Sequence, residues 1–334
     1  MDQVIEYGDE VRAALSASVP IVALESTIIS HGLPRPRNAV VARELEAIVR
    51  AEGACPATVA VLDGVARVGL DAVELERVAS EPHMHKLGRR ELPLAIAAKA
   101  SGATTVSATA TLAHRAGIAV FSTGGLGGVH RGFVESFDES ADLLVLAETP
   151  ITVVAAGVKS ILDVPATLER LETLNVTVVG YATTTFPGFY LHSSNCPLSW
   201  SLESPDEVAA VIAARGALGL HSALLVANPV PLTEQLDPAL HDKALEEALE
   251  GARREGVRGQ QLTPYLLAKL VEATGGGGAR GQSRGRAQQR AARREDRGRG
   301  GALSAIRFRT TDRRSPRGPG RCRPGRSGPR RSRR

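Results

Sequence analysis

The stretch Ile151-Thr152-Val153-Val154-Ala155-Ala156-Gly157-Val158-Lys159-Ser160 is an apolar run of strand length that ends in a glycine turn and a lysine. Short apolar runs bounded by turn residues are typical of buried strands. Open α/β sheets place their chemistry at the carboxyl ends of such strands, where a partly desolvated amine loses its proton more readily. We therefore predict a strand over 151–155 and take Lys159 as a candidate nucleophile. The alternative is a lysine at a helix start whose ammonium extends to water.

Strand and helix patterns alternate along most of the chain, and 65–68 is the expected hairpin partner of 58–62. Strand patterns cover 21–29, 58–62, 65–68, 104–108, 118–122, 151–155, 176–181 and 223–227. Helical spacing covers 38–52, 71–78, 91–100, 109–116, 160–174, 205–215, 238–255 and 263–273. The polar, irregular segment after Tyr181 suggests a lid or a subunit contact. We expect an α/β fold with a mostly parallel sheet and helices on both faces (three-layer α/β/α), in a single domain over residues 1–278.

Charge is distributed unevenly along the chain. The formal net charge of the 334 residues is +5, with 43% hydrophobic and 3% aromatic residues. Residues 279–334 contain 20 arginines, no lysine and three acids, a net charge of +17, which leaves −12 for residues 1–278. The sequence thus joins an acidic body to an Arg/Gly-rich tail whose composition predicts disorder.

Cysteine usage and the first residues bear on the compartment. Cys55, Cys196 and Cys322 show neither paired nor metal-type spacing, which favours a reducing compartment. The opening residues Met1–Glu6 lack the basic and apolar regions of a signal peptide, and no apolar run reaches the roughly 18 residues of a membrane helix. We expect a cytoplasmic protein with no membrane partner.

A glycine-rich loop, Thr123-Gly124-Gly125-Leu126-Gly127-Gly128-Val129-His130-Arg131-Gly132, follows a predicted strand. Its backbone amides could approach an anion closely, and His130 and Arg131 favour an anionic ligand. The loop lacks the Lys-Ser/Thr ending of a nucleotide P-loop and the spacing of a dinucleotide fingerprint. A plain tight turn is the alternative.

Carboxylates stand out at two places. Glu25 interrupts the apolar run 21–29, where an ionised side chain is costly unless it is paired or used. Asp138, Glu139 and Asp142 lie within five residues, and hard divalent cations such as Mg²⁺ or Mn²⁺ bind oxygen ligands while keeping several waters. The alternative for this second group is a solvated helix start with Ser140 as its cap.

Several motifs, taken in order, resemble the pseudouridine-5'-phosphate glycosidase family from about Pro20 to Gly276. They are Ala23-Leu24-Glu25-Ser26-Thr27-Ile28-Ile29-Ser30-His31-Gly32, Gly102-Ala103-Thr104-Thr105-Val106, Ser122-Thr123-Gly124-Gly125 through Val129-His130-Arg131-Gly132, Ser140-Ala141-Asp142, Gly157-Val158-Lys159-Ser160-Ile161-Leu162-Asp163, and Ala227-Asn228-Pro229.

The resemblance implies reversible cleavage of pseudouridine 5'-phosphate to ribose 5-phosphate and uracil, with Mn²⁺ or another divalent metal, by a homotrimeric α/β protein. It implies that Lys159 is the nucleophile, that Glu25 is the proton donor and that Asp138 is the metal ligand. The substrate-contacting positions that it implies are Lys86, Val106, Ser140, Ala141 and Asp142, to which we add His130 of the glycine-rich loop as an anion contact.

The resemblance stops after Thr274-Gly275-Gly276. Family members continue with segments of the type S-L-x-A-N and N-N-A-R-L-A-x-x-I-A, whereas Gln288 and Gln289 stand here at the asparagine pair. A Gln codon before a codon starting with C, read one base later, gives only Asn or Ser, and the same shift over 288–297 permits N-N-A-R-L-A-A-K-I-A. We therefore hypothesise a one-base shift within Gly275–Gly278 that makes the tail out-of-frame sequence.

Two other functions remain open. A Schiff-base aldolase acting on a sugar phosphate would share Lys159 but would not need a uracil pocket. An RNA-binding tail would attract phosphates in a salt-dependent way, but Phe308 is its only aromatic residue, so it lacks a stacking platform. We therefore expect a small nucleotide as the substrate and no nucleic-acid partner.

Overall fold

The computed structural model describes residues 4–257 and 262–273. The predictions that concern the tail 279–334, its disorder and its possible frame shift lie outside the described residues. Within the described residues, no helix is long and apolar enough to cross a membrane. The cytoplasmic location stays a prediction.

An 11-stranded sheet runs through the described part of the chain. All its named pairings are parallel except those of β3 with β4 and with β6. The predicted hairpin is thus confirmed as β3–β4. In spatial order the strands are β1 (Ile5–Tyr7), β4 (Val65–Val68), β3 (Cys55–Leu62), β2 (Ile21–Leu24), β7 (Val120–Ser122), β8 (Thr152–Ala155), β11 (Leu224–Ala227), β9 (Thr177–Tyr181) and β10 (Ser201–Leu202), while β6 (Gly102–Thr104) pairs with β3 and β5 (His85–Leu87).

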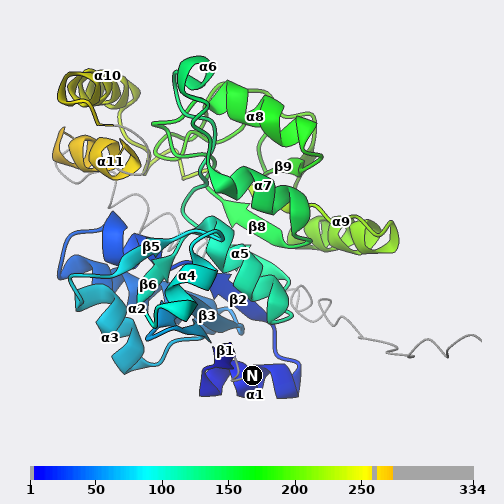
Figure 1. Cartoon of the computed structure of the whole chain (residues 1–334). Coiled ribbons are helices and arrows are strands. Elements are labelled where there is room, and N and C mark those ends of the chain that lie inside the picture. The colour runs from blue at the N-terminus through cyan, green and yellow to red at the C-terminus, as the bar shows by residue number, and fades with distance from the viewer. Residues whose placement is uncertain (1–3, 258–261, 274–334) are drawn as a thin grey trace, which may run out of the picture.

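Helices connect most of these strands (Figure 1), and α10 and α11 lie together at one end of the molecule. The helical elements are α1 (Asp9–Ala17), the π-helical turn η1 (Ile28–Gly32), α2 (Arg37–Ala51), α3 (Ala72–Ser80), α4 (Leu92–Ala97), α5 (Val106–Arg115), α6 (Phe133–Ser136), α7 (Ala141–Glu148), α8 (Val164–Thr173), α9 (Pro205–Ala217), α10 (Pro238–Glu255) and α11 (Leu262–Ala273).

Alternate residues of single strands pack into different cores, so side chains cover both faces of the sheet. On β2, Val22 and Leu24 pack with Val41 and Leu45 of α2, whereas Ala23 belongs to the large core on the other face. The same alternation holds on β11, where one set of side chains packs on α9 and the other joins the large core. The predicted α/β fold with helices on both faces of a mostly parallel sheet is confirmed.

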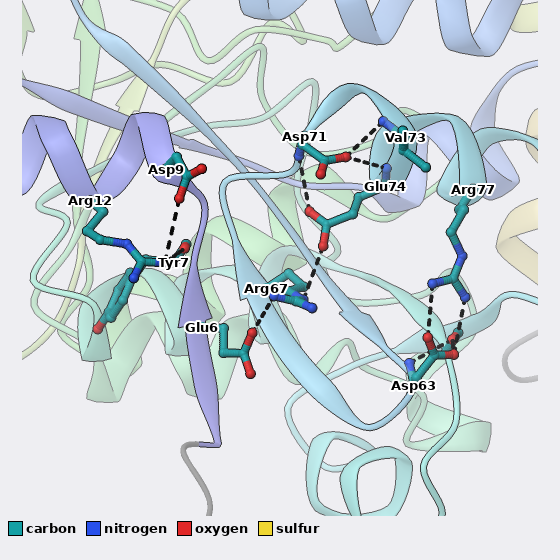
Figure 2. A network of polar contacts seen from close by, with 11 residues as sticks. Glu6, Tyr7, Asp9, Arg12, Asp63, Arg67, Asp71, Val73, Glu74 and Arg77 are labelled. Atoms are coloured by element: carbon teal, nitrogen blue, oxygen red, sulfur yellow. Dashed lines mark hydrogen bonds and ion pairs between the residues drawn. The ribbon is translucent and has the colours of Figure 1, made fainter.

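Polar contacts fix the sheet edge at β1 (Figure 2). Asp71 caps α3, since its carboxylate accepts the amides of Val73 and Glu74 at 2.8 Å each, and the Glu74 carboxylate accepts the Asp71 amide at 3.1 Å. Arg67 of β4 lies between Glu6 of β1 and Glu74, and forms ion pairs with both. The short edge strand is thereby tied to α3.

Two predicted strands extend too far. The strand predicted over 21–29 ends at Leu24, because the chain then turns into η1. The strand predicted over 104–108 ends at Thr104, and α5 begins at Val106. In both cases β-branched and apolar residues continue past the end of the strand, so local propensity does not mark the boundary.

The helix predicted over 160–174 begins at Val164. Asp163 precedes it as the N-cap and accepts the amide of Ala166 at 3.0 Å, which fixes where the helix starts. Residues 160–162 therefore belong to the turn that carries Lys159.

The segment after Tyr181 is irregular, as predicted. Its centre is buried against the rest of the protein and so does not have the exposed position of a lid. Phe186, Phe189 and Tyr190 are buried. The Phe189 amide donates to the Ala156 carbonyl at 3.0 Å, next to the turn that carries Lys159. This segment therefore contacts the turn that carries Lys159 and restricts its movement.

Candidate active site

Three side chains follow adjacent parallel strands. Because β2, β7 and β8 are neighbours and run parallel, their carboxyl ends lie at one edge of the sheet. Glu25 follows β2 directly, Thr123 follows β7 directly, and Lys159 lies in the turn after β8. Backbone bonds fix this turn: the Lys159 amide donates to the Leu126 carbonyl, and the Leu126 amide donates to the Gly157 carbonyl, both at 3.0 Å.

Glu25 is half-buried, and hydrogen bonds fix both its carboxylate and the adjacent residue, Ser26. The Thr123 hydroxyl donates a hydrogen bond to the Glu25 carboxylate. Ser26 is fully buried, and its hydroxyl donates to the Val59 carbonyl at 2.6 Å and accepts the Thr104 amide at 2.8 Å. Sequence reasoning gave Thr123 no role, although its place directly after a strand at this edge is a usable signal.

Lys86 reaches the same site from β5, where it pairs in register with Ala103 of β6. Burial lowers the pKa of Lys86, and the charge of Lys159 lowers it further, while Asp142 and Glu25 oppose the shift. Side-chain charges influence one another strongly only at short range. The side chains of Lys159, Asp142 and Glu25 therefore all lie near Lys86.

His130 lies near the two lysines and faces Asp138. The His130 Nδ1 atom is 3.9 Å from the Asp138 Oδ2 atom, and the His130 amide donates to the Asp138 carbonyl at 3.0 Å. Burial lowers the pKa of His130; Asp138 opposes this, and the charges of Lys86 and Lys159 lower the pKa further. The imidazole is therefore mostly neutral near pH 7.

The three acids of the predicted metal-binding group have different partners. Glu139 accepts two hydrogen bonds from the Arg170 guanidinium, each at 3.0 Å. Asp142 is 5% exposed and accepts backbone amides. Asp138 keeps a side chain that is 32% exposed and faces His130. Asp138 therefore differs from Glu139 and Asp142 in that neither an arginine nor a backbone amide is recorded as a donor to its carboxylate among the described residues.

Asp138 is suited to hold a divalent cation as its single protein ligand, with water molecules and a phosphate completing the coordination. Within the described residues there is no group of three or more His, Cys, Asp or Glu side chains that could hold a metal ion. Hard cations such as Mg²⁺ bind one or two carboxylates together with waters and substrate phosphates. One partly exposed carboxylate therefore matches a cation that binds together with a phosphorylated substrate.

Asp142 joins three parts of the site. Its carboxylate accepts the amides of Ser107 and Gly127, both at 2.9 Å. Ser107 lies in the first turn of α5, whose N-cap Thr105 makes no side-chain cap, so Asp142 caps α5 from outside that helix. A Cβ added to Gly127 would lie 2.2 Å from the Ser140 hydroxyl oxygen. Ser140 and Asp142 can therefore lie this close to the loop only because residue 127 has no side chain.

The remaining predicted substrate contacts lie at helix starts. Val106 is the first residue of α5 and is 1% exposed, so almost none of its surface is open to a ligand. Ser140 caps α7 by accepting the Asp142 amide at 3.2 Å, as the alternative interpretation expected. Ala141 is exposed as the first residue of α7.

The glycine-rich loop is packed inside the protein. Residues 123–130 are all buried. A Cβ at Gly125 would lie 2.4 Å from the Phe189 ring, and one at Gly128 would lie 2.4 Å from the Thr167 hydroxyl oxygen. Close packing therefore explains these glycines better than an open anion cradle does. Five of the loop amides donate to acceptors within the protein, namely those of Thr123, Leu126, Gly127, Val129 and His130.

Comparison with known proteins places the chain in a family. Residues 10–283 match the family described as indigoidine synthase A like protein. The chain is 66% identical over 268 residues to the pseudouridine-5'-phosphate glycosidase of Streptomyces griseus subsp. griseus, which covers 80% of this chain and 83% of that protein. The enzyme of the same name from Salinispora tropica is 59% identical over 273 residues, covering 81% and 84%.

Two solved structures have the same fold. The prealnumycin C-glycosynthase AlnA, in complex with ribulose 5-phosphate, superposes with a TM-score of 0.80 at 36% identity and covers 91% of this chain and 97% of its own. An indigoidine synthase A-like protein from Thermotoga maritima gives a TM-score of 0.75 at 36% identity, covering 84% and 90%. The resemblance carried by the sequence motifs is thus confirmed. The chain belongs to the indigoidine synthase A like family and, within it, to the pseudouridine-5'-phosphate glycosidases, a family of enzymes.

Proposed function

We propose that this chain reversibly cleaves the C–C glycosidic bond of pseudouridine 5'-phosphate to ribose 5-phosphate and uracil. The observation that carries the proposal is the convergence of Lys159, Lys86 and Glu25 from three separate strands. The relatives' name supplies the substrate, and a protein of the same fold holds a sugar phosphate. Cleavage of this C–C bond requires a nucleophilic amine and a proton-donating carboxyl group in the same site.

Lys159 acts as the nucleophile in this proposal. A C–C glycoside has no leaving oxygen or nitrogen to protonate, so the route of ordinary glycosidases is poor. The amine of Lys159 instead bonds to C1' of the opened ribose. The lone pair of the adduct nitrogen then expels the uracil carbon, which takes a proton at C5, and an iminium forms at C1'. Water hydrolyses this iminium to ribose 5-phosphate and the free lysine amine.

Glu25 moves the protons. Opening the ribose ring needs a proton at the ring oxygen, and departing uracil needs one at its C5 atom. A half-buried carboxyl group held by the Thr123 hydroxyl can deliver the first proton, take up the proton that the lysine nitrogen loses on bonding to C1', and deliver that proton to C5. Its location after β2, adjacent to the end of β7, keeps it on the same edge of the sheet as Lys159.

Three further residues would hold the phosphate and the metal. Lys86 binds the substrate phosphate, with the neutral His130 as a further donor. Asp138 would hold the divalent cation, Mn²⁺ according to the family resemblance, through one carboxylate and bound waters. When bound, the cation orients the substrate and offsets its negative charge.

The test is release of uracil from pseudouridine 5'-phosphate by the purified chain in the presence of Mn²⁺. Lys159→Met should abolish release, because thioether sulfur cannot form the adduct. Lys243→Met on α10, where the side chain is 75% exposed, is the matched control and should leave the rate unchanged. Absence of uracil release by the unsubstituted chain contradicts the proposal, as does full activity of Lys159→Met.

A Schiff-base lyase acting on a sugar phosphate is the second candidate, favoured by the ribulose 5-phosphate bound to AlnA. Borohydride reduction separates the two functions. The glycosidase predicts a ribosyl adduct with pseudouridine 5'-phosphate together with one equivalent of uracil, whereas the lyase predicts a shortened adduct and cleavage of a sugar carbon–carbon bond.

We also propose a homotrimer, as the family resemblance implies. Large apolar side chains such as Trp200 (70% exposed) and Leu218 (74% exposed) remain uncovered in the single chain, which is consistent with a contact surface. Light scattering should give three times the chain mass of 35.1 kDa. A monomeric mass contradicts this part of the proposal.

For the tail we keep the proposal of a one-base shift within Gly275–Gly278. The coding DNA tests it directly, because the alternative frame should encode the family's asparagine-bearing terminal segment without stop codons. Uracil release should then be measured for the chain with this tail and for a frame-corrected version. Stop codons or unrelated residues in the alternative frame contradict the proposal.

A further inference from the structure

We propose that Thr123 is a positioning residue for Glu25, which it holds with its carboxyl group directed into the site. The inference rests on the proposed function and extends it to a residue outside the predicted site. Thr123 does not need to touch the substrate, because its effect passes through the Glu25 carboxylate.

The geometry around Thr123 makes its hydroxyl a fixed donor. Its side chain is 4% exposed, and its amide donates to the Val154 carbonyl of β8 at 3.0 Å. Its hydroxyl donates to Glu25 at the end of β2. Thr123 thus bonds both neighbouring strands of β7, so its donor cannot move without disturbing the sheet edge.

The energetic consequence is specific to a hydroxyl. Hydrogen bonds to a carboxylate are stronger than bonds between neutral groups, and they restrict rotation of the carboxyl plane. They also favour the ionised form, so loss of the hydroxyl should raise the pH at which Glu25 exchanges its proton. The other charged groups near Lys86 and Glu25 are Lys159 and Asp142, and a Thr123 substitution changes none of these charges.

Thr123→Val removes the hydroxyl and keeps the side-chain volume. We expect kcat for uracil release to fall about tenfold to a hundredfold, the range for losing a hydrogen bond to a charged group, with KM nearly unchanged. The limb of the pH profile that reports Glu25 should move to higher pH. Thr123→Ser keeps the donor and should restore most of kcat and the original limb.

The control is Thr111→Val on α5, which removes a half-buried hydroxyl that donates to the Ser107 carbonyl at 2.8 Å and should leave the pH profile unchanged. If Thr123→Val does not fold, Thr123→Ala is compared with Thr123→Ser instead. Equal losses in the Val and Ser variants, or a wild-type pH profile in the Val variant, would overturn the inference. Lack of uracil release by the unsubstituted chain contradicts the proposed function itself, and the positioning role with it.

Discussion

Lys86 and Lys159 come from different parts of the sheet, yet the charge of Lys159 lowers the pKa of Lys86 beyond the effect of burial. Two amines therefore lie in one site. We assign the substrate phosphate to Lys86, whose charge depends on pH because its pKa is lowered. We assign the bond to the sugar to Lys159, because backbone hydrogen bonds fix the turn after β8 in which Lys159 lies.

Lys86→Met should raise KM for pseudouridine 5'-phosphate about tenfold to a hundredfold and change kcat much less, because a charge-assisted contact to the phosphate is lost. In the unsubstituted chain KM should also rise as the pH climbs through the lowered pKa of Lys86, above which that amine is neutral. The variant should lack this rise. An unchanged KM, or an equal loss with unphosphorylated pseudouridine, contradicts the assignment.

Gly127→Ala should destabilise the fold by about 1–3 kcal/mol, because the new Cβ would press on Ser140 and Asp142. Gly216→Ala on α9 is the matched control: a Cβ there meets nothing within 4 Å, and alanine favours the helix by about 0.5–1 kcal/mol. Chemical denaturation of both variants measures the difference. Equal stabilities would show that space at Gly127 is not limiting.

Asp142→Asn should cost about 1–3 kcal/mol, since the new amide nitrogen would face one of two buried backbone donors and leave it unsatisfied. Asp206→Asn, an exposed acid in the first turn of α9, removes the same charge at a helix start and should cost only about 0.3–1 kcal/mol. Urea unfolding compares them. A smaller loss for Asp142→Asn than for its control would argue against the cap on α5.

Asp138→Asn should raise the Mn²⁺ concentration for half-maximal activity by at least about tenfold, because hard cations depend on carboxylate charge. Glu139→Gln loses the neighbouring acid, which pairs with Arg170, and should keep the metal dependence of the unsubstituted chain. Titration of metal-stripped protein with Mn²⁺ provides the readout. The proposal fails if the two variants behave alike.

The sequence predicts the parts of the fold that depend on local patterns. The apolar run before Lys159 forms β8 because its alternate side chains fill cores on both faces of the sheet. The motif order also indicates which residues carry the chemistry. What local patterns do not specify is β5, the three-residue strand that carries Lys86, since so short a segment has no periodicity.

Local sequence patterns also do not predict the residue at which α5 begins. Thr104-Thr105-Val106 reads as a continuing strand, because β-branched residues favour extended backbone. The helix begins at Val106 because Asp142, from a distant part of the chain, accepts the Ser107 amide. The bond between Thr123 and Glu25 joins residues that follow different strands, so the sequence offers only their positions directly after those strands as a signal.

The central claim is that Lys159, and not the neighbouring Lys86, bonds to the sugar. Borohydride reduction during turnover of pseudouridine 5'-phosphate, followed by peptide mass mapping, tests it directly. The account predicts a ribosyl phosphate adduct on the peptide that contains Lys159, still present in Lys86→Met and absent in Lys159→Met. A label on Lys86, or uracil release without any labelled lysine, would contradict it.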